Sequence, residues 1–338
     1  MLNAAGKLVG RVAPQLSRGR QDSTAVVGGQ IGFRAFSFLS AVWFAWKART
    51  LISETIDRPE SLVRRNDWIS YILPLDHWRT VVLVAATFAL ISAGICLLTA
   101  GGRSLPTGLR IGAAVSALVV NSLQQTAGGI SHWNYFVVLG LLFSVLLPVQ
   151  RPSREKVMDV DLSYRLFHAS LLTIYSLAGL WKLVHIALAL ASGSVRGTWL
   201  DSASLIETAR TNRLVFGHRI RAEPVLEFLS PFSPVLFVLF AVLMTGAIFA
   251  SLNRSALLIV SPLIFGFHLF NYWAFGADFR FTGLVALATL FPYEVLSDIR
   301  ASSPRSFGQT LLRAFAALFP FSITRLARDL LDSAQPRL

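Results

Sequence analysis

The residue best placed to do chemistry in this sequence is a lysine inside an apolar stretch. Lys182 lies in the segment RLFHASLLTIYSLAGLWKLVHI, where His168 and Tyr175 precede it at intervals of seven residues. Side chains seven residues apart share one face of a helix, so these three polar groups line one side of the segment. Ala178 and Gly179 are small enough to let a neighbouring helix approach closely, which predicts that this side packs inward.

A lysine withdrawn from water has chemistry that an exposed lysine lacks. Loss of hydration favours the neutral amine over the ammonium ion, and a neutral amine can accept a proton or act as a nucleophile. We therefore expect Lys182 to serve as a base or nucleophile. The structural alternative is that Lys182 reaches out to the membrane surface or pairs with an acidic residue. For His168 and Tyr175, an interfacial or hydrogen-bonded core position is the favoured interpretation.

Two further clusters bring polar side chains into apolar surroundings. The sequence SHWNY contains His132 and Asn134, and FHLFNYW contains His268 and Asn271. If the chain starts on the inner side of a membrane, both clusters fall in its outer half, at the depth of Lys182. Polar groups at one depth on several helices are what an outward-opening site in a helical bundle needs. Hydrogen bonds from these side chains would position a substrate or stabilise a developing oxyanion.

Apolar helices must position these residues. Hydrophobic residues make up 54% of the chain and charged residues 14%, with a mean hydropathy of +0.58. This exceeds what the core of a soluble protein of 338 residues requires. The sequence therefore predicts an all-α integral membrane protein, a polytopic bundle of about eight transmembrane helices. The expected spans are residues 25–46, 80–100, 109–127, 134–150, 166–192, 233–251, 255–275 and 280–297.

The polar residues within the expected spans refine this prediction. The third span contains Asn121, Gln124 and Gln125, which would be costly in contact with lipid and are therefore expected to face the bundle interior. Arg34 interrupts the first span. Transmembrane strands are not expected, because the apolar runs are continuous and longer than a barrel strand.

The distribution of lysine and arginine predicts the orientation. More of these residues fall in the segments that share a side with the N-terminus, and cytoplasmic segments of membrane proteins carry such an excess. We expect residues 1–24 to form a cytoplasmic tail, 25–297 the transmembrane domain, and 298–338 a second cytoplasmic tail. Arginines punctuate an apolar stretch in the second tail, which is typical of an amphipathic helix lying on the membrane surface. A transit peptide is the alternative for the first tail.

Charge and cysteine content restrict the other functions. The net charge of +13 is explained by this topology and by attraction to anionic lipid, and no nucleic-acid partner is expected because the basic residues form no single patch. Cys96 is the only cysteine, which rules out an intrachain disulfide or a zinc–thiolate cluster. Histidines scattered over different helices are poor evidence for a metal, so none is expected.

Two motifs in the expected order resemble a known family. The sequence IYSLAGLWKL fits the pattern aromatic–x–x–Ala–Gly–x–x–Lys–Leu, with Tyr175 and Lys182 at its aromatic and lysine positions. His268 and Asn271 fit a later His–x–x–Asn pattern. Residues 25–297 therefore resemble the horizontally transferred transmembrane (HTTM) domain, the membrane part of vitamin K-dependent gamma-carboxylases.

The resemblance implies specific roles and a cofactor. Lys182 takes the position of the catalytic base that deprotonates a reduced quinone, and His268 and His132 would assist it, although Tyr135 lies one residue further from His132 than in the family. Trp181 replaces the family's second lysine, which argues against glutamate carboxylation here. The family resemblance also implies a bacterial inner membrane. The substrate-binding positions would be Asn271, Asn134, Tyr175 and Trp199.

Two classes of function remain open on this sequence. The first is a membrane enzyme in which Lys182 acts on a reduced quinone, on another lipid-soluble substrate or on a peptide. The second is a non-catalytic helper in peptide maturation, export or partner binding, acting through residues 193–232, where apolar and charged residues interleave. That segment could equally seal the bundle as an amphipathic helix. A transporter is disfavoured, because the sequence shows neither an internal repeat nor paired broken helices.

Overall fold

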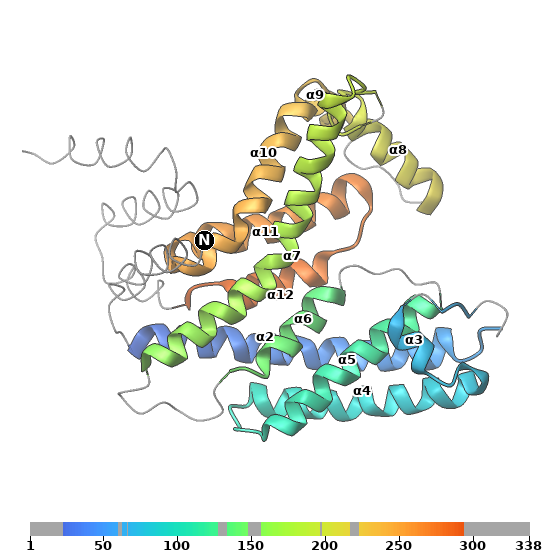
Figure 1. Cartoon of the computed structure of the whole chain (residues 1–338), viewed down its shortest axis with the longest axis vertical. Coiled ribbons are helices and arrows are strands. Elements are labelled where there is room, and N and C mark those ends of the chain that lie inside the picture. The colour runs from blue at the N-terminus through green and yellow to red at the C-terminus, as the bar shows by residue number, and fades with distance from the viewer. Residues whose placement is uncertain are drawn as a thin grey trace, which may run out of the picture.

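The computed structural model describes residues 23–59, 63–65, 67–127, 134–147, 157–196, 198–216 and 223–293. Within these ranges every regular element is a helix (Figure 1), so the expectation of an all-α chain is confirmed for this part. His132, most of the N-terminal tail and the whole C-terminal tail with its expected amphipathic helix lie outside the described residues.

Each of the eight expected spans contains a helix. The helices are α2 Ser23–Thr50, α3 Trp68–Ile72, α4 Trp78–Ala100, α5 Thr107–Thr126, α6 Asn134–Ser144, α7 Val157–Ala191, α8 Ser204–Phe216, α9 Glu223–Leu229, α10 Ser233–Gly246, α11 Arg254–Phe275 and α12 Arg280–Leu290. A π-helical turn, Leu51–Thr55, continues α2, and 3-10 turns occupy Leu75–His77, Ser230–Phe232 and Ala247–Leu252.

Four of the described helical stretches are long and apolar enough to cross a membrane. They are Leu75–Ala100, Val160–Ala191, Glu223–Leu252 and Ala256–Phe275. Helices α6 and α12 are apolar but have 11 residues each. Helices α2 and α5 have 28 and 20 residues, but charged or amide side chains interrupt them. The described part of the chain thus contains four helical stretches of full transmembrane length and composition, together with shorter or more polar helices.

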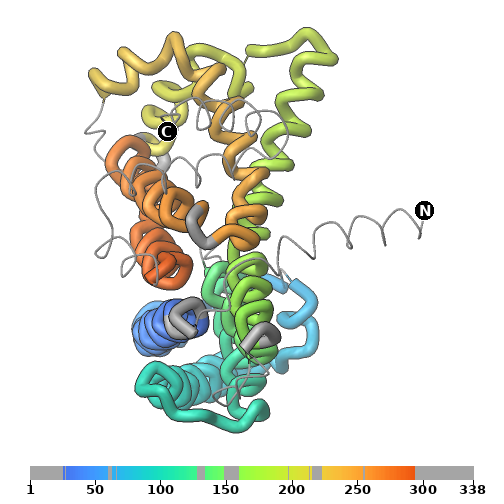
Figure 2. The backbone as a smooth tube through the Cα atoms, turned by 90° about the vertical axis from the view of Figure 1, so that its left-hand side faces the viewer, coloured from blue at the N-terminus to red at the C-terminus, as the bar shows by residue number. Residues whose placement is uncertain are grey.

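The helix axes follow two main directions (Figures 1 and 2). Helices α2 and α4 pack against each other, and α5 follows beside α4, whereas α7 crosses α2 obliquely and pairs with α10 (Figures 1 and 2). In Figure 2, α2, α11 and α12 are seen nearly along their axes, while α7 and α10 run up the picture. Helices α8 and α9 lie near the far end of α7, so the C-terminal half of α7 carries its residues away from α2, α4 and α5.

The core where α2, α6 and α7 meet depends on a glycine. Phe36 of α2 and Phe167 of α7 are fully buried and pack edge to face, with ring centroids 5.3 Å apart. A Cβ atom on Gly140 of α6 would lie 2.3 Å from Cζ of Phe36. Only a residue without a side chain lets α6 come this close to the two rings.

The small residues of α7 allow α10 to approach closely, as the sequence predicts. A Cβ atom on Gly179 would lie 2.4 Å from the backbone nitrogen of Thr245. One turn earlier, the backbone N–H of Ile248 donates a hydrogen bond of 3.0 Å to the hydroxyl of Ser176. These contacts fix how α7 is rotated about its axis, and so where Lys182 lies.

Arg64 and residues 67–72 cover one end of α5. Asp67 caps α3 by accepting a 2.8 Å hydrogen bond from the N–H of Ser70, and the same oxygen accepts a 2.7 Å bond from the hydroxyl of Ser122. The N–H of Arg64 donates to the carbonyl of Thr126 over 3.0 Å. The segment is thereby tied to the end of the helix that carries the amides expected to face inward.

Replacement of Gly179 by leucine tests the contact between α7 and α10. The added side chain would overlap the backbone of α10, so we expect Gly179→Leu to destabilise the protein by about 1–3 kcal/mol. Thermal unfolding of the purified protein in detergent would measure this. Gly94→Leu is the matched control, because a Cβ atom at Gly94 meets nothing within 4 Å. Equal melting temperatures for the two variants would contradict the contact.

Candidate functional site

The structure distributes the site residues expected from the sequence over three places. Lys182 lies with Trp199, Tyr175 lies with His268, and Asn134 lies with residues of α2 and α5. Similar depth in the bundle therefore does not bring all of these side chains into contact. Each group has its own partners and its own chemistry.

Lys182 lies on the face of an indole ring. Its Nζ atom is 4.9 Å from the centroid of Trp199, which follows α7 in a turn where Thr198 donates a 2.7 Å hydrogen bond to the carbonyl of Val195. Phe237 of α10 packs against the indole of Trp199, with the ring centroids 4.3 Å apart. A cation held over an indole gains about 0.5–2 kcal/mol, depending on how far it is withdrawn from water. Lys182 is half-buried and makes no hydrogen bond or ion pair with any residue that the structure describes.

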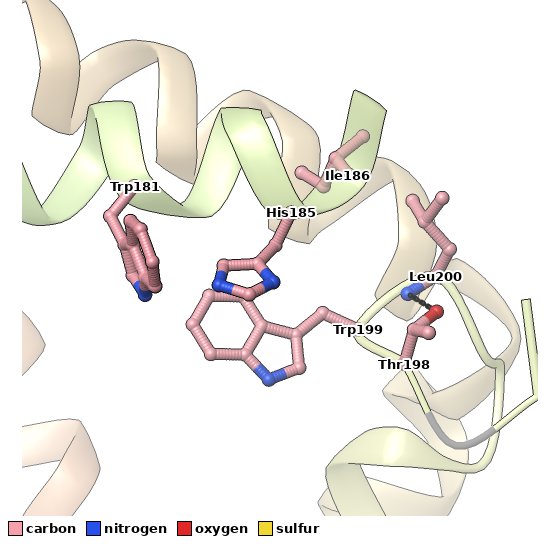
Figure 3. A pocket seen from close by; sticks show the side chains of 6 residues that line it. All are labelled: Trp181, His185, Ile186, Thr198, Trp199 and Leu200. Carbon is pink, nitrogen blue, oxygen red and sulfur yellow. Dashed lines mark hydrogen bonds between the residues drawn. The ribbon is translucent and has the colours of Figure 1, made fainter. Parts of the chain in front are cut away.

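A small cavity lies on the same indole. It has a volume of about 290 Å³, and Figure 3 shows Trp181 and His185 of α7 lining it together with Trp199. The rings of Trp181 and His185 pack edge to face, with centroids 4.4 Å apart. The lining residues are Trp181, His185, Ile186, Thr198, Trp199 and Leu200.

The chemistry of this cavity combines aromatic surfaces with a few polar groups. Trp181 is 63% exposed and Trp199 is 39% exposed, so the cavity is open to the surroundings of α7. Flat rings stack on indoles, and the indole N–H groups and the imidazole offer hydrogen bonds to oxygen atoms. The cavity can hold a flat, oxygen-bearing molecule against Trp199, the indole that Lys182 contacts.

Tyr175 and His268 form a buried pair in the contact between α7 and α11. The hydroxyl oxygen of Tyr175 and Nε2 of His268 are 2.8 Å apart, and both residues are buried. Phe136 of α6 packs edge to face on Tyr175. Asn271 donates a 3.0 Å hydrogen bond to the carbonyl of Phe267 in its own helix. The His–x–x–Asn motif thus contributes to helix packing here, and within the described part of the chain neither of its residues hydrogen-bonds to Lys182.

Asn134 belongs to a buried network around a different lysine. Lys47 of α2, which is 3% exposed, donates a 2.7 Å hydrogen bond to the side-chain oxygen of Gln124. That oxygen also accepts a 3.3 Å bond from the amide of Asn134, whose own oxygen accepts a 3.1 Å bond from the indole N–H of Trp43. The network joins α2, α5 and α6.

The sequence indicated half of this network and missed the other half. Asn121 and Gln124 are buried, as expected for amides in an apolar helix. The expected first span ends at residue 46 and so leaves Lys47 in a loop, whereas α2 continues to Thr50. Trp43 and Lys47 are four residues apart and so share a helical face, which is the signal that extends the span.

The aromatic cavity was also only partly indicated by the sequence. Lys182 and Trp199 were singled out, and the structure places them in contact. The sequence marks Trp181 only as a departure from the family pattern, and no motif marks His185. The spacing of Trp181 and His185, four residues apart around Lys182, is the signal that would have found them.

None of the protein-family models, curated proteins or solved structures compared with this chain matches it. The function must therefore be argued from the site itself and from the motifs in the sequence.

Replacement of Gln124 tests the network around Lys47. Gln124→Leu removes the oxygen that accepts hydrogen bonds from Lys47 and Asn134, so we expect the protein to lose about 2 kcal/mol of stability. Chemical denaturation in detergent would measure the loss. Gln125→Leu is the matched control, because Gln125 bonds to Tyr135 at an exposed position. A loss as large in the control would show that the buried network is not the cause.

Proposed function

We propose that this chain is a multi-pass membrane protein of eight spans, similar to the HTTM domain of vitamin K-dependent gamma-carboxylases. Four helices of transmembrane length and composition support membrane insertion. The remaining four expected spans also coincide with helices, although α6 and α12 are short within the described residues. The ordered motifs around Lys182 and His268 support the relationship to the family.

We further propose that Lys182 is a catalytic base for a lipid-soluble substrate such as a reduced quinone. The observation that carries this proposal is the position of its Nζ atom, 4.9 Å from the ring centroid of Trp199, an indole that also lines the aromatic cavity. In the reaction step, a ring hydroxyl gives its proton to the neutral amine, which leaves a ring oxyanion beside an ammonium ion. The ammonium ion then stabilises that oxyanion.

The surface around the cavity favours a substrate that arrives through the bilayer. Leu180 and Leu188 of α7 are 50% and 59% exposed, as expected for side chains that contact lipid. A cavity beside such a surface is accessible from the hydrocarbon region. A lipid-soluble ring can reach it laterally, whereas a peptide would have to leave water first.

A non-catalytic helper that binds a peptide or partner protein is the second candidate. Phe228 of α9 is 72% exposed, although its neighbour Leu226 is buried in a small cluster with Ile206, Ala209 and Ala274. Arg210 of α8 forms ion pairs with Glu223 and Glu227 of α9. Helices α8 and α9 therefore pack against the bundle, while the side chain of Phe228 stays exposed. A helper would tolerate changes at Lys182 and lose partner capture in Phe228→Ser.

Single cysteines test the proposed topology. In a Cys96→Ala background, we expect Ser194→Cys, after α7, to react with a membrane-impermeant maleimide in intact cells. Ser104→Cys, between α4 and α5, should react only after the cells are opened. Both cysteines labelled equally in intact cells would rule out the eight-span arrangement with cytoplasmic termini.

Replacement of Lys182 tests the catalytic proposal. Removal of a general base costs about a hundredfold to ten-thousandfold in rate, so we expect Lys182→Ala and Lys182→Arg to abolish the product that the wild-type protein forms. Mass spectrometry of lipids and secreted peptides from cells with and without the protein would identify that product. Arg196→Ala is the control, since Arg196 is an exposed basic residue beyond the same helix. Full product formation by both lysine variants, once inserted normally, would refute the role of Lys182.

A further inference from the structure

Helices α4 and α5 lie side by side at one edge of the molecule (Figures 1 and 2), and an apolar groove of about 810 Å³ runs between them. Its lining comes from these two helices and from the turn before α4. Large exposed side chains form its rims, with Phe88 and Ile91 on α4 and Ile111 and Val115 on α5. In a membrane, either lipid or another protein must cover these side chains.

Small residues at intervals of four line the groove on the side of α5. Gly108, Gly112 and Ser116 share one face of the helix. A Cβ atom on Gly108 or Gly112 would meet nothing within 4 Å, whereas the missing side chains of Gly140 and Gly179 admit a neighbouring helix. A glycine in the middle of a helix costs about 0.5–1 kcal/mol relative to alanine. Packing within this chain therefore gives no reason for a glycine at position 112.

The hydroxyl of Ser116 is an independent sign that the groove lacks a partner. Ser116 is 7% exposed, and its oxygen makes no hydrogen bond with any residue that the structure describes. Ser261, in comparison, donates a 2.7 Å hydrogen bond to the carbonyl of Leu257 in its own helix. Hydrocarbon offers an unpaired hydroxyl no substitute for water. A polar group on a helix that lies in the groove would satisfy Ser116, whereas a lipid chain would not.

We propose that α5 of a second copy of this chain lies in the groove, so that the protein is a symmetric dimer with parallel α5 helices. This inference depends on the proposed membrane topology and not on the chemistry of Lys182. All copies insert in the same orientation, so a two-fold axis along the membrane normal makes the two α5 helices parallel. Small residues at intervals of four are the pattern that lets two membrane helices approach closely.

The surface of α5 is self-complementary, which favours a second copy over an unrelated helix. The branched side chains of Ile111 and Val115 directly precede the small residues Gly112 and Ser116, so a ridge lies beside a hollow on the same helix. A two-fold axis places the ridge of each copy in the hollow of the other. It also brings the two copies of Ser116 together, and one hydroxyl can then donate a hydrogen bond to the other.

The groove is large enough for a specific interface. Its lining extends over residues 77–95 and 108–119. These stretches amount to about 43 Å of helix, and a helix is about 11 Å wide, so each copy offers roughly 500 Å². A dimer would bury roughly 1,000 Å² in total, which reaches the size expected of a biological interface.

Disulfide crosslinking tests the contact between copies. In a Cys96→Ala background, Gly112→Cys places a thiol next to the two-fold axis, so oxidation of membranes that contain the full-length protein should convert most of it to a covalent dimer. Gly94→Cys is the matched control, because Gly94 is an open, exposed glycine on α4 that does not line the groove. No crosslink at Gly112→Cys, or an equal yield at Gly94→Cys, would overturn the dimer.

Energy transfer between donor-labelled and acceptor-labelled copies in liposomes measures the strength of the dimer. We expect Gly112→Leu, which fills the hollow, to weaken association at least tenfold, and Ser116→Ala to weaken it about threefold. Gly94→Leu should leave association unchanged. The melting temperature of Gly112→Leu should match that of Gly94→Leu, because a side chain at either position meets nothing in its own chain.

Two results in this assay would contradict the inference. Wild-type protein without energy transfer would mean that lipid or a different protein covers the groove, and energy transfer that persists in Gly112→Leu would place the contact elsewhere. Maleimide labelling of Ser194→Cys and Ser104→Cys reports the topology separately. Failure to dimerise in a protein that is labelled as expected therefore overturns the dimer alone, whereas the wrong labelling pattern overturns the proposed topology.

Discussion

A polar group withdrawn from water must find a partner, and this requirement shapes both lysine centres of the chain. The amino group of Lys47 donates a hydrogen bond to Gln124, in a network that also fixes Asn134. Lys182 instead lies on the face of Trp199, which partly compensates its charge and leaves its hydrogen-bonding capacity unused by the described residues. The first lysine is thereby committed to packing, whereas the second keeps the donors that the proposed function needs.

Each apolar run that the sequence marks as a span contains a helix, because long apolar runs can only be helices if they are to lie in lipid. The ends of the helices are less predictable. Hydropathy falls where tryptophan and lysine enter the end of α2, although the backbone continues as a helix to Thr50 and then as a π-helical turn. Lys47 was therefore assigned to a loop. Its burial depends on the amides of α5, which only the tertiary structure brings to it.

The site was predictable only in part, because depth along a helix does not determine contact. Lys182 and Trp199 meet because a turn returns the chain against α7, and the close approach of α10 at Gly179 sets how α7 is rotated. Asn134 and His268 were expected at the same depth as Lys182. In the structure, Asn134 bonds to residues of α2 and α5, and His268 bonds to Tyr175, whereas Lys182 contacts Trp199. His185 joins the site through the aromatic packing of Trp181, which no polar motif in the sequence marks.

The contact between the amino group of Lys182 and the indole of Trp199 is the central claim, and nuclear magnetic resonance can test it directly. In protein labelled with ¹⁵N at lysine side chains, the signal of Lys182 should be displaced by the ring current of the indole. We expect Trp199→Leu to move this signal and to leave that of Lys47 unchanged, since Lys47 lies near Trp43 and Trp46 instead. A Lys182 signal that stays in place in Trp199→Leu would contradict the account.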